Sequence, residues 1–168
     1  MAPAGGTDVD GSGDSTGYVF GDVYSFGDLC PDLARRELLH VQAAAGSGLP
    51  AGLYAFLEFY CPRPDCDCRV VMWRVMFRGS ARSAPAIVAT LSWCWAEDDP
   101  HGPALEPAPQ SRSAPALLDR LKLAIRDQGY GDVVKAHYAA VRSEARRRGS
   151  PVYALLHSKG GRPGPARR

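Results

Sequence analysis

Three stretches of the chain, 53–60, 68–77 and 86–95, are rich in aromatic and β-branched residues and are bounded by Gly, Pro, Ser or Asp. That composition is typical of β-strands. The connections between them, 61–67 and 78–85, are short, and short connections join antiparallel neighbours. The pattern therefore predicts an antiparallel meander of three strands.

Apolar residues recur at helical spacing on both sides of this meander. The spacing predicts helices over about 31–45, 115–128 and 132–148, the first opened by a proline and the last capped by Asp132. A short apolar run at 152–156 is a candidate fourth strand.

Together these elements predict an α+β fold, with a three- or four-stranded antiparallel sheet covered on one face by about three helices. The 168 residues fit one domain, which we place at 18–157. The ends, 1–17 and 158–168, are rich in Gly and polar residues with little to bury, which predicts disorder and makes the C-terminal end a basic tail. Within the domain, 97–115 is a proline-rich linker or an ordered surface loop.

The second and third strands have one register that brings apolar residues together across the pair. It sets Val71, Trp73, Val75 and Phe77 against Trp93, Leu91, Ala89 and Ile87, in that order. A slip of one residue would turn a whole apolar row to the opposite face. The same register places Cys94 opposite Val70, on the face of Cys68.

Three of the five cysteines, Cys61, Cys66 and Cys68, lie within eight residues at the predicted hairpin. Opposed positions on antiparallel strands bring side chains to about 5 Å, so two thiolates at the mouth of the hairpin and one in its loop can share an ion. This predicts a structural zinc site at one end of the sheet, with Cys94 as fourth ligand and His137 as the main alternative. The other candidates for the fourth ligand are His101, His40 and Cys30. Redox-active thiols, an iron–sulfur cluster and unliganded packing are the alternative interpretations of the cluster.

The chain has no apolar run near the ~18 residues that span a bilayer, and its first residues lack the basic and apolar regions of a secretory signal. These absences predict a cytoplasmic protein that does not bind membranes. Thiols stay reduced in the cytosol, so clustered cysteines there favour metal over disulfides.

The segment YAFLEFYCPRPDCDCRVVMWRV resembles a group of uncharacterised bacterial proteins with a Tyr-Cys…Cys-Asp-Cys-Arg core inside a sheet. The later segment GYGDVVKAHYAAVR is similar to a Tyr…His-Tyr…Arg helix near the end of those proteins. The resemblance covers about 53–145 and implies a bacterial source and a shared domain, but no activity. Some of those proteins carry a SEC-C-type zinc motif, which this chain lacks. If His137 matches the histidine of that helix, the resemblance favours it as a ligand or a buried polar anchor.

Charge is distributed unevenly although the net charge is only +2. From Asp119 onward there are 12 Lys and Arg against 4 Asp and Glu, an excess of eight. Basic residues crowd one side of the last predicted helix: Lys135, Arg142, Arg146, Arg147 and Arg148. Such residues neutralise phosphates, and Trp73, Trp93 and Trp95 offer rings on which bases can stack. Nucleic-acid binding is therefore the runner-up function, against the simpler explanation of a solvated basic face and core tryptophans.

The motifs of α/β-hydrolases, zinc proteases and nucleotide-binding loops are absent, so an enzyme is not favoured. Glu58 is a candidate perturbed carboxylate in an aromatic strand, although pairing with Arg69 or exposure at a sheet edge is the expected explanation. His137 is expected to be a core histidine with satisfied hydrogen bonds, a ligand or catalyst being the alternatives. The sequence favours a small zinc-stabilised interaction or accessory module with a protein partner, ahead of nucleic-acid binding and thiol redox chemistry.

Overall fold

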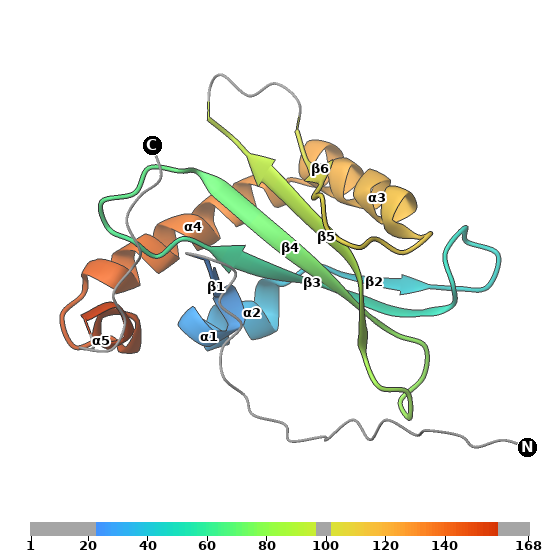
Figure 1. Ribbon diagram of the computed structural model, residues 1–168, viewed down its shortest axis with the longest axis horizontal. Coiled ribbons are helices and arrows are strands. Elements are labelled where there is room, and N and C mark those ends of the chain that lie inside the picture. The colour runs from blue at the N-terminus through green and yellow to red at the C-terminus, as the bar shows by residue number, and fades with distance from the viewer. Residues whose placement is uncertain (1–22, 97–101, 158–168) are drawn as a thin grey trace, which may run out of the picture.

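An antiparallel sheet is the scaffold of the computed structural model, which describes residues 23–96 and 102–157 (Figure 1). Its strands are β1 (Tyr24–Ser25), β2 (His40–Ala43), β3 (Gly52–Tyr60), β4 (Val70–Arg78), β5 (Ala86–Cys94) and β6 (Ala104–Leu105). The long strands β3, β4 and β5 lie where the sequence predicts the meander. β1 and β2 both pair with β3, and β6 pairs with β5. The α+β class is confirmed, with more strands than the three or four expected.

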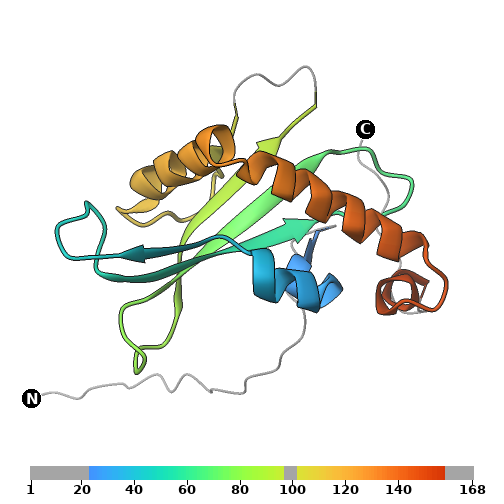
Figure 2. The same ribbon diagram turned by 180° about the vertical axis from the view of Figure 1, so that it is seen from behind.

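The helices lie on one face of this sheet. They are α1 (Phe26–Leu29), α2 (Pro31–Glu37), α3 (Ala114–Asp127), α4 (Tyr130–Arg146) and α5 (Pro151–His157). Figure 1 and Figure 2, which view the molecule from opposite sides, agree in placing α3, α4 and the α1–α2 pair on the same face of the sheet. The opposite face of the sheet carries no helix of the described part of the chain.

The core fills the space between the sheet and these helices. Alternation along β3 sends Tyr54, Phe56, Glu58 and Tyr60 into it, and each is at most 1% exposed. The strands β4 and β5 and the helices α3 and α4 add fully buried residues that include Trp73, Leu91, Leu117, Leu121, Val134 and Val141. Burial of each such apolar side chain contributes roughly 1.5–3 kcal/mol to the stability of the fold. The packed sheet and α4 therefore hold the residues at their ends in fixed positions.

The register between β4 and β5 is largely the one that the apolar pattern predicts. Val71, Trp73 and Val75 pair with Trp93, Leu91 and Ala89, and Val70 pairs with Cys94. The prediction fails after Val75, where a shift in the register sets Phe77 against Ala86 and leaves Ile87 opposite Met76. An apolar pattern cannot reveal such a bulge when its neighbours on both sides are apolar too.

The helix predicted over 31–45 is wrong in its second half. α2 ends at Glu37, and Leu38 already has an extended backbone, with ψ of 136°. The next residues form β2, which pairs in an antiparallel ladder with 52–55 of β3. Pairing with an edge that lies far along the chain thus overrides the local helical spacing at Val41 and its neighbours.

Two further expectations near the C-terminus are corrected. The run 152–156 is not a strand but part of α5, which begins with Pro151 in its first turn and is capped by Ser150, whose Oγ accepts the amide hydrogen of Tyr153 at 2.9 Å. α4 starts at Tyr130, so Asp132 lies in its first turn and does not cap it. The residue before the helix is Gly129, whose φ of 72° suits glycine.

The described part of the proline-rich segment, 102–113, is an ordered loop on the edge of β5. The Gln110 side chain accepts the amide hydrogen of Thr90 at 3.0 Å and donates to the carbonyl groups of Thr90 and Glu106 at 3.0 and 2.8 Å. The terminal segments 1–17 and 158–168 lie outside the described residues. Among the described helices, none is both long and apolar enough to cross a membrane.

Candidate metal centre

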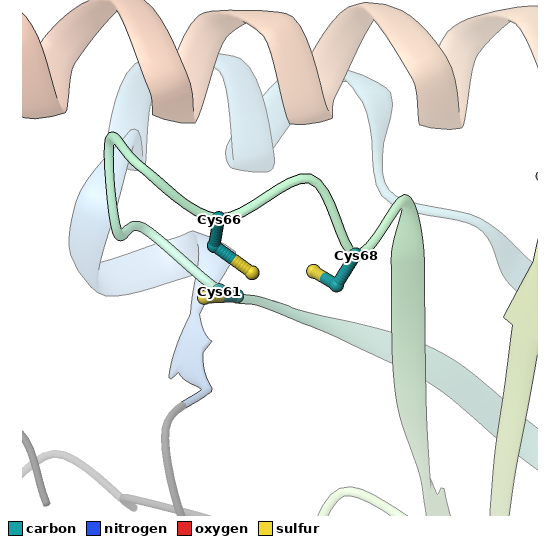
Figure 3. A group of neighbouring side chains, drawn as sticks. All are labelled: Cys61, Cys66 and Cys68. Carbon is teal, nitrogen blue, oxygen red and sulfur yellow. The ribbon is translucent and has the colours of Figure 1, made fainter. Parts of the chain in front are cut away.

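Three cysteines meet at the end of the β3–β4 hairpin. Cys61 follows the last residue of β3, Cys66 lies in the connecting loop, and Cys68 precedes β4. Figure 3 shows the three side chains side by side at the end of the hairpin. Their sulfur atoms all lie within 4.8 Å of one another. Tetrahedral zinc, with Zn–S bonds near 2.3 Å, holds its sulfurs about 3.8 Å apart. The three thiols therefore need only a small contraction to share one ion.

The hydrogen bonds among these thiols favour a negative charge on Cys68. The Cys61 thiol donates to Cys68 and, although burial opposes the effect, this bond and the amide hydrogen of Val70 lower the pKa of Cys68 to about 5. The same donation and burial raise the pKa of Cys61. One thiolate is therefore present at neutral pH before any metal arrives, and metal binding displaces protons from the other two thiols.

The loop that carries Cys66 is held in place by α4. Arg142 donates through Nη1 to the carbonyl groups of Arg63, at 2.8 Å, and of Cys66, and through Nη2 to that of Pro64 at 2.9 Å. Arg146, one turn further along α4, donates to the same Pro64 carbonyl at 3.3 Å. The guanidinium of Arg142 thus gathers three carbonyl groups of the loop and fixes the backbone on which a ligand sits.

Cys94 pairs with Val70 as expected, but its thiol does not join the other three. Its Sγ lies 3.8 Å from the carbonyl oxygen of Cys68, and within the described ranges the cluster with sulfurs 4.8 Å apart or closer contains Cys61, Cys66 and Cys68 alone. The reason lies in Arg69, whose φ of 48° interrupts the alternation of side chains just before β4 begins. Cys68 therefore turns toward the hairpin loop while Cys94 keeps the direction set by the strand.

The alternative fourth ligands lie elsewhere. His137 is buried and bonded through both ring nitrogens to carboxylates, His40 is exposed on β2, and Cys30 is buried between α1 and α2. His101 lies outside the described residues. The structure therefore brings together three of the four predicted ligands.

A second polar cluster, centred on Glu58, lies deeper in the core. Neither pairing with Arg69 nor exposure at a sheet edge, the two expected explanations of Glu58, is correct. Glu58 is only 1% exposed and accepts hydrogen bonds from Tyr60, at 2.7 Å, and from Tyr130, and it lies 2.7 Å from Nδ1 of His137. Arg69 pairs instead with Asp67, at 3.2 Å. The alternation of 53–60 already assigns Glu58 to the buried row and would have ruled out exposure, whereas its partners on α4 are too distant in sequence to be found this way.

Most of the basic residues singled out on the last helix have partners within the protein. Arg142 and Arg146 donate to the carbonyl groups of the cysteine loop. Arg147 pairs with Glu144 at 2.5 Å, and Lys135 lies 3.9 Å from Asp132. Trp73 is fully buried, and Trp95 packs edge-on against a tyrosine of α4. Lys135, Arg146, Arg147 and Arg148 are all exposed, and the nucleic-acid surface that they would form stays a prediction.

Comparison with protein-family models, with curated proteins and with solved structures finds no match to this chain. The resemblance drawn from its motifs therefore stays a prediction, and the function is inferred from the site alone.

Proposed function

We propose that this protein is a small zinc-stabilised interaction module of the cytoplasm, in which Cys61, Cys66 and Cys68 hold the ion. The observation that carries the proposal is the meeting of three sulfur atoms within 4.8 Å at the end of the hairpin. Thiolates favour zinc and other soft ions over the magnesium and calcium that oxygen ligands select. A cytoplasmic setting keeps such thiols reduced and available.

The position of the site supports a structural role for the ion. It joins the end of β3 to the start of β4, and its loop is tied to α4 through Arg142. An ion at this point links the sheet to the helix that covers it. When a metal site forms only on folding, the free energy of metal binding adds to the stability of the fold.

The uncovered face of the sheet supports the interaction role. Leu53 and Ile87 are 39% and 50% exposed there, and a hollow of about 290 Å³ runs between Leu53, Leu57 and Met76. Apolar side chains gathered on a surface mark sites of protein contact. Arg78 lies on the rim of the hollow, so the proposed partner is a protein segment that combines apolar with acidic side chains.

A thermal unfolding series tests the structural role of the ion. Cys66→Ser and Cys68→Ser should each lower the melting temperature, and a chelator should lower that of the wild type but not that of the two variants. The matched control is Cys30→Ala, which removes a buried thiol outside the site and leaves the response to the chelator intact. Equal responses to the chelator in all four proteins contradict the proposal.

A peptide-library selection tests the surface. Selected peptides should contain acidic and apolar residues and should lose binding to Ile87→Glu. Leu123→Glu is the control, because Leu123 is similarly exposed, at 38%, on α3 behind the sheet. Peptides that bind the Ile87 variant as well as they bind the wild type contradict this part of the proposal.

Thiol redox chemistry is the second candidate, favoured by the thiolate character of Cys68 beside the Cys61 thiol. The Cys68 thiolate would attack a disulfide of a substrate, whose leaving sulfur takes the electron pair and a proton. Cys61 would then displace the second sulfur, which gives a Cys61–Cys68 disulfide and two reduced thiols of the substrate. Treatment of metal-free protein with glutathione disulfide should then rapidly yield an intramolecular disulfide. Slow oxidation would contradict a redox function and favour zinc binding as the function of these cysteines.

A further inference from the structure

The buried carboxylate of Glu58 has donors for both of its oxygen atoms. Oε2 accepts from the Tyr60 hydroxyl at 2.7 Å, and Oε1 accepts from the hydroxyl of Tyr130. Two hydroxyl groups solvate the carboxylate, but they bring no positive charge. An ionised carboxylate at 1% exposure is costly unless a cation lies beside it. The ionisable group that the structure places there is His137, whose Nδ1 lies 2.7 Å from Oε2.

His137 faces a carboxylate on each side of its ring. Nδ1 points to Glu58 of β3, and Nε2 lies 3.1 Å from Oε2 of Glu37, the last residue of α2. An ionised carboxylate can only accept hydrogen bonds, so each of these contacts requires a hydrogen on the ring nitrogen. Both nitrogens carry hydrogen only in the imidazolium ion. The geometry is therefore that of a cation held between two anions from different elements.

Among the described residues, the remaining surroundings of the ring supply no competing charge. The Phe26 ring of α1 stacks on it at 4.2 Å, and the hydroxyl groups of Tyr60 and Tyr130 are directed to Glu58. The Cys30 thiol, between α1 and α2, is kept neutral because burial, together with the charge of Glu144, raises its pKa. The titratable groups that face His137 directly are thus Glu58 from β3 and Glu37 from α2.

We propose that His137 is a proton-operated latch, which in its doubly protonated form ties the end of α2 to β3 and α4. When the ring loses one proton, one nitrogen becomes an acceptor that faces a carboxylate. The Glu58 side has no freedom to move, because its carboxylate is enclosed by two tyrosines. The Glu37 side chain is 42% exposed, so it can turn to water and release α2. The device is independent of the cysteine site.

The direction of the response follows from the charges. Burial opposes the imidazolium, but the hydrogen bonds and negative charges of Glu58 and Glu37 outweigh it and raise the pKa of His137 above its usual value of 6.5. A raised pKa means that the bridge stabilises the fold fully below about pH 6.5. That stabilisation is lost as the pH rises through the pKa of the folded protein. The latch is closed below about pH 6.5 and opens as the pH rises through the raised pKa of His137.

Two measurements on the full chain test the latch. Nitrogen NMR of the imidazole rings should show both nitrogens of His137 protonated at about pH 6.5, with slowly exchanging N–H hydrogens. Amide hydrogen exchange in 33–39, corrected for its intrinsic dependence on pH, should then speed up by up to about tenfold per pH unit as the pH rises from about 6.5 to the pKa of His137 in the folded protein, and should level off above that pKa. Glu37→Gln should abolish that dependence and leave exchange in β4 unchanged.

The control variant is Arg35→Gln, which breaks only the exposed pair of Arg35 with Asp32 on the same helix and should keep the wild-type profile. A single unprotonated nitrogen in His137 at about pH 6.5 overturns the proposal, because the bridge then lacks its cation. So does exchange in α2 that follows the intrinsic rate at every pH in the wild type. A Glu37→Gln profile that matches the wild type likewise overturns it.

Discussion

Replacing Arg142 by glutamine removes the guanidinium that gathers the carbonyl groups of the cysteine loop. A glutamine amide is shorter and can reach one of the three carbonyl groups at most, so two hydrogen bonds to a charged donor are lost. Such bonds contribute about 1.5–3 kcal/mol each, and the lower value applies here because the contacts are partly exposed to water. The total of about 3 kcal/mol corresponds to a loss of about 100-fold in zinc affinity.

Competition with a chromogenic zinc chelator measures that affinity, and circular dichroism confirms that the variant is folded. Arg147→Gln is the matched control, because Arg147 directly follows α4 and forms an ion pair with Glu144, away from the carbonyl groups of the cysteine loop. Arg142→Lys should fall between the two, since an ammonium group cannot reach three carbonyl groups at once. The reasoning is refuted if Arg142→Gln binds zinc within about twofold of the wild type while Arg147→Gln does the same.

Three further outcomes are expected. Trp73→Ala should lower the free energy of unfolding by about 3–5 kcal/mol in urea titrations, because it empties a fully buried site, and a loss below about 1 kcal/mol would contradict the described core. Gly52→Ala should destabilise the protein far more than Gly46→Ala in the same titrations. Both positions have positive φ, but a Cβ on Gly52 would lie 2.6 Å from the carbonyl oxygen of Arg78, whereas a Cβ on Gly46 would have no atom within 4 Å. In metal-free protein, alkylation of Cys68 should rise through a midpoint near pH 5 as the thiolate forms, and Cys61→Ala should move that midpoint upward; a midpoint unaffected by the variant would contradict the donation from Cys61.

The strands that carry the site could be predicted from the sequence because each is long, apolar and bounded by turn residues. The register of β4 against β5 followed from the same pattern as far as Val75. Partnerships with distant residues could not be predicted in this way. The local spacing predicts helix where β2 lies, because it contains no information on the ladder of β2 with β3. The bulge after Val75 likewise does not change the apolar pattern of the sequence.

In the candidate site too, local features could be predicted from the sequence and contacts between distant residues could not. Clustering in sequence was enough to bring Cys61, Cys66 and Cys68 together. The prediction of Cys94 as fourth ligand depended on regular alternation of side chains through Arg69, and the positive φ of that residue breaks the alternation. The roles of Arg142 and His137 arise from contacts more than 70 residues away along the chain, with a loop carbonyl group and a buried carboxylate, and only the folded structure brings these groups together.

The most direct test of the central claim is the zinc content of the protein purified without an affinity tag. Native mass spectrometry should show about one zinc ion per folded chain, because three thiolates meet at one point and a structural site is filled on folding. The same measurement on Cys66→Ser should show the ion lost or greatly reduced. A wild-type chain that is folded and free of metal would contradict the account.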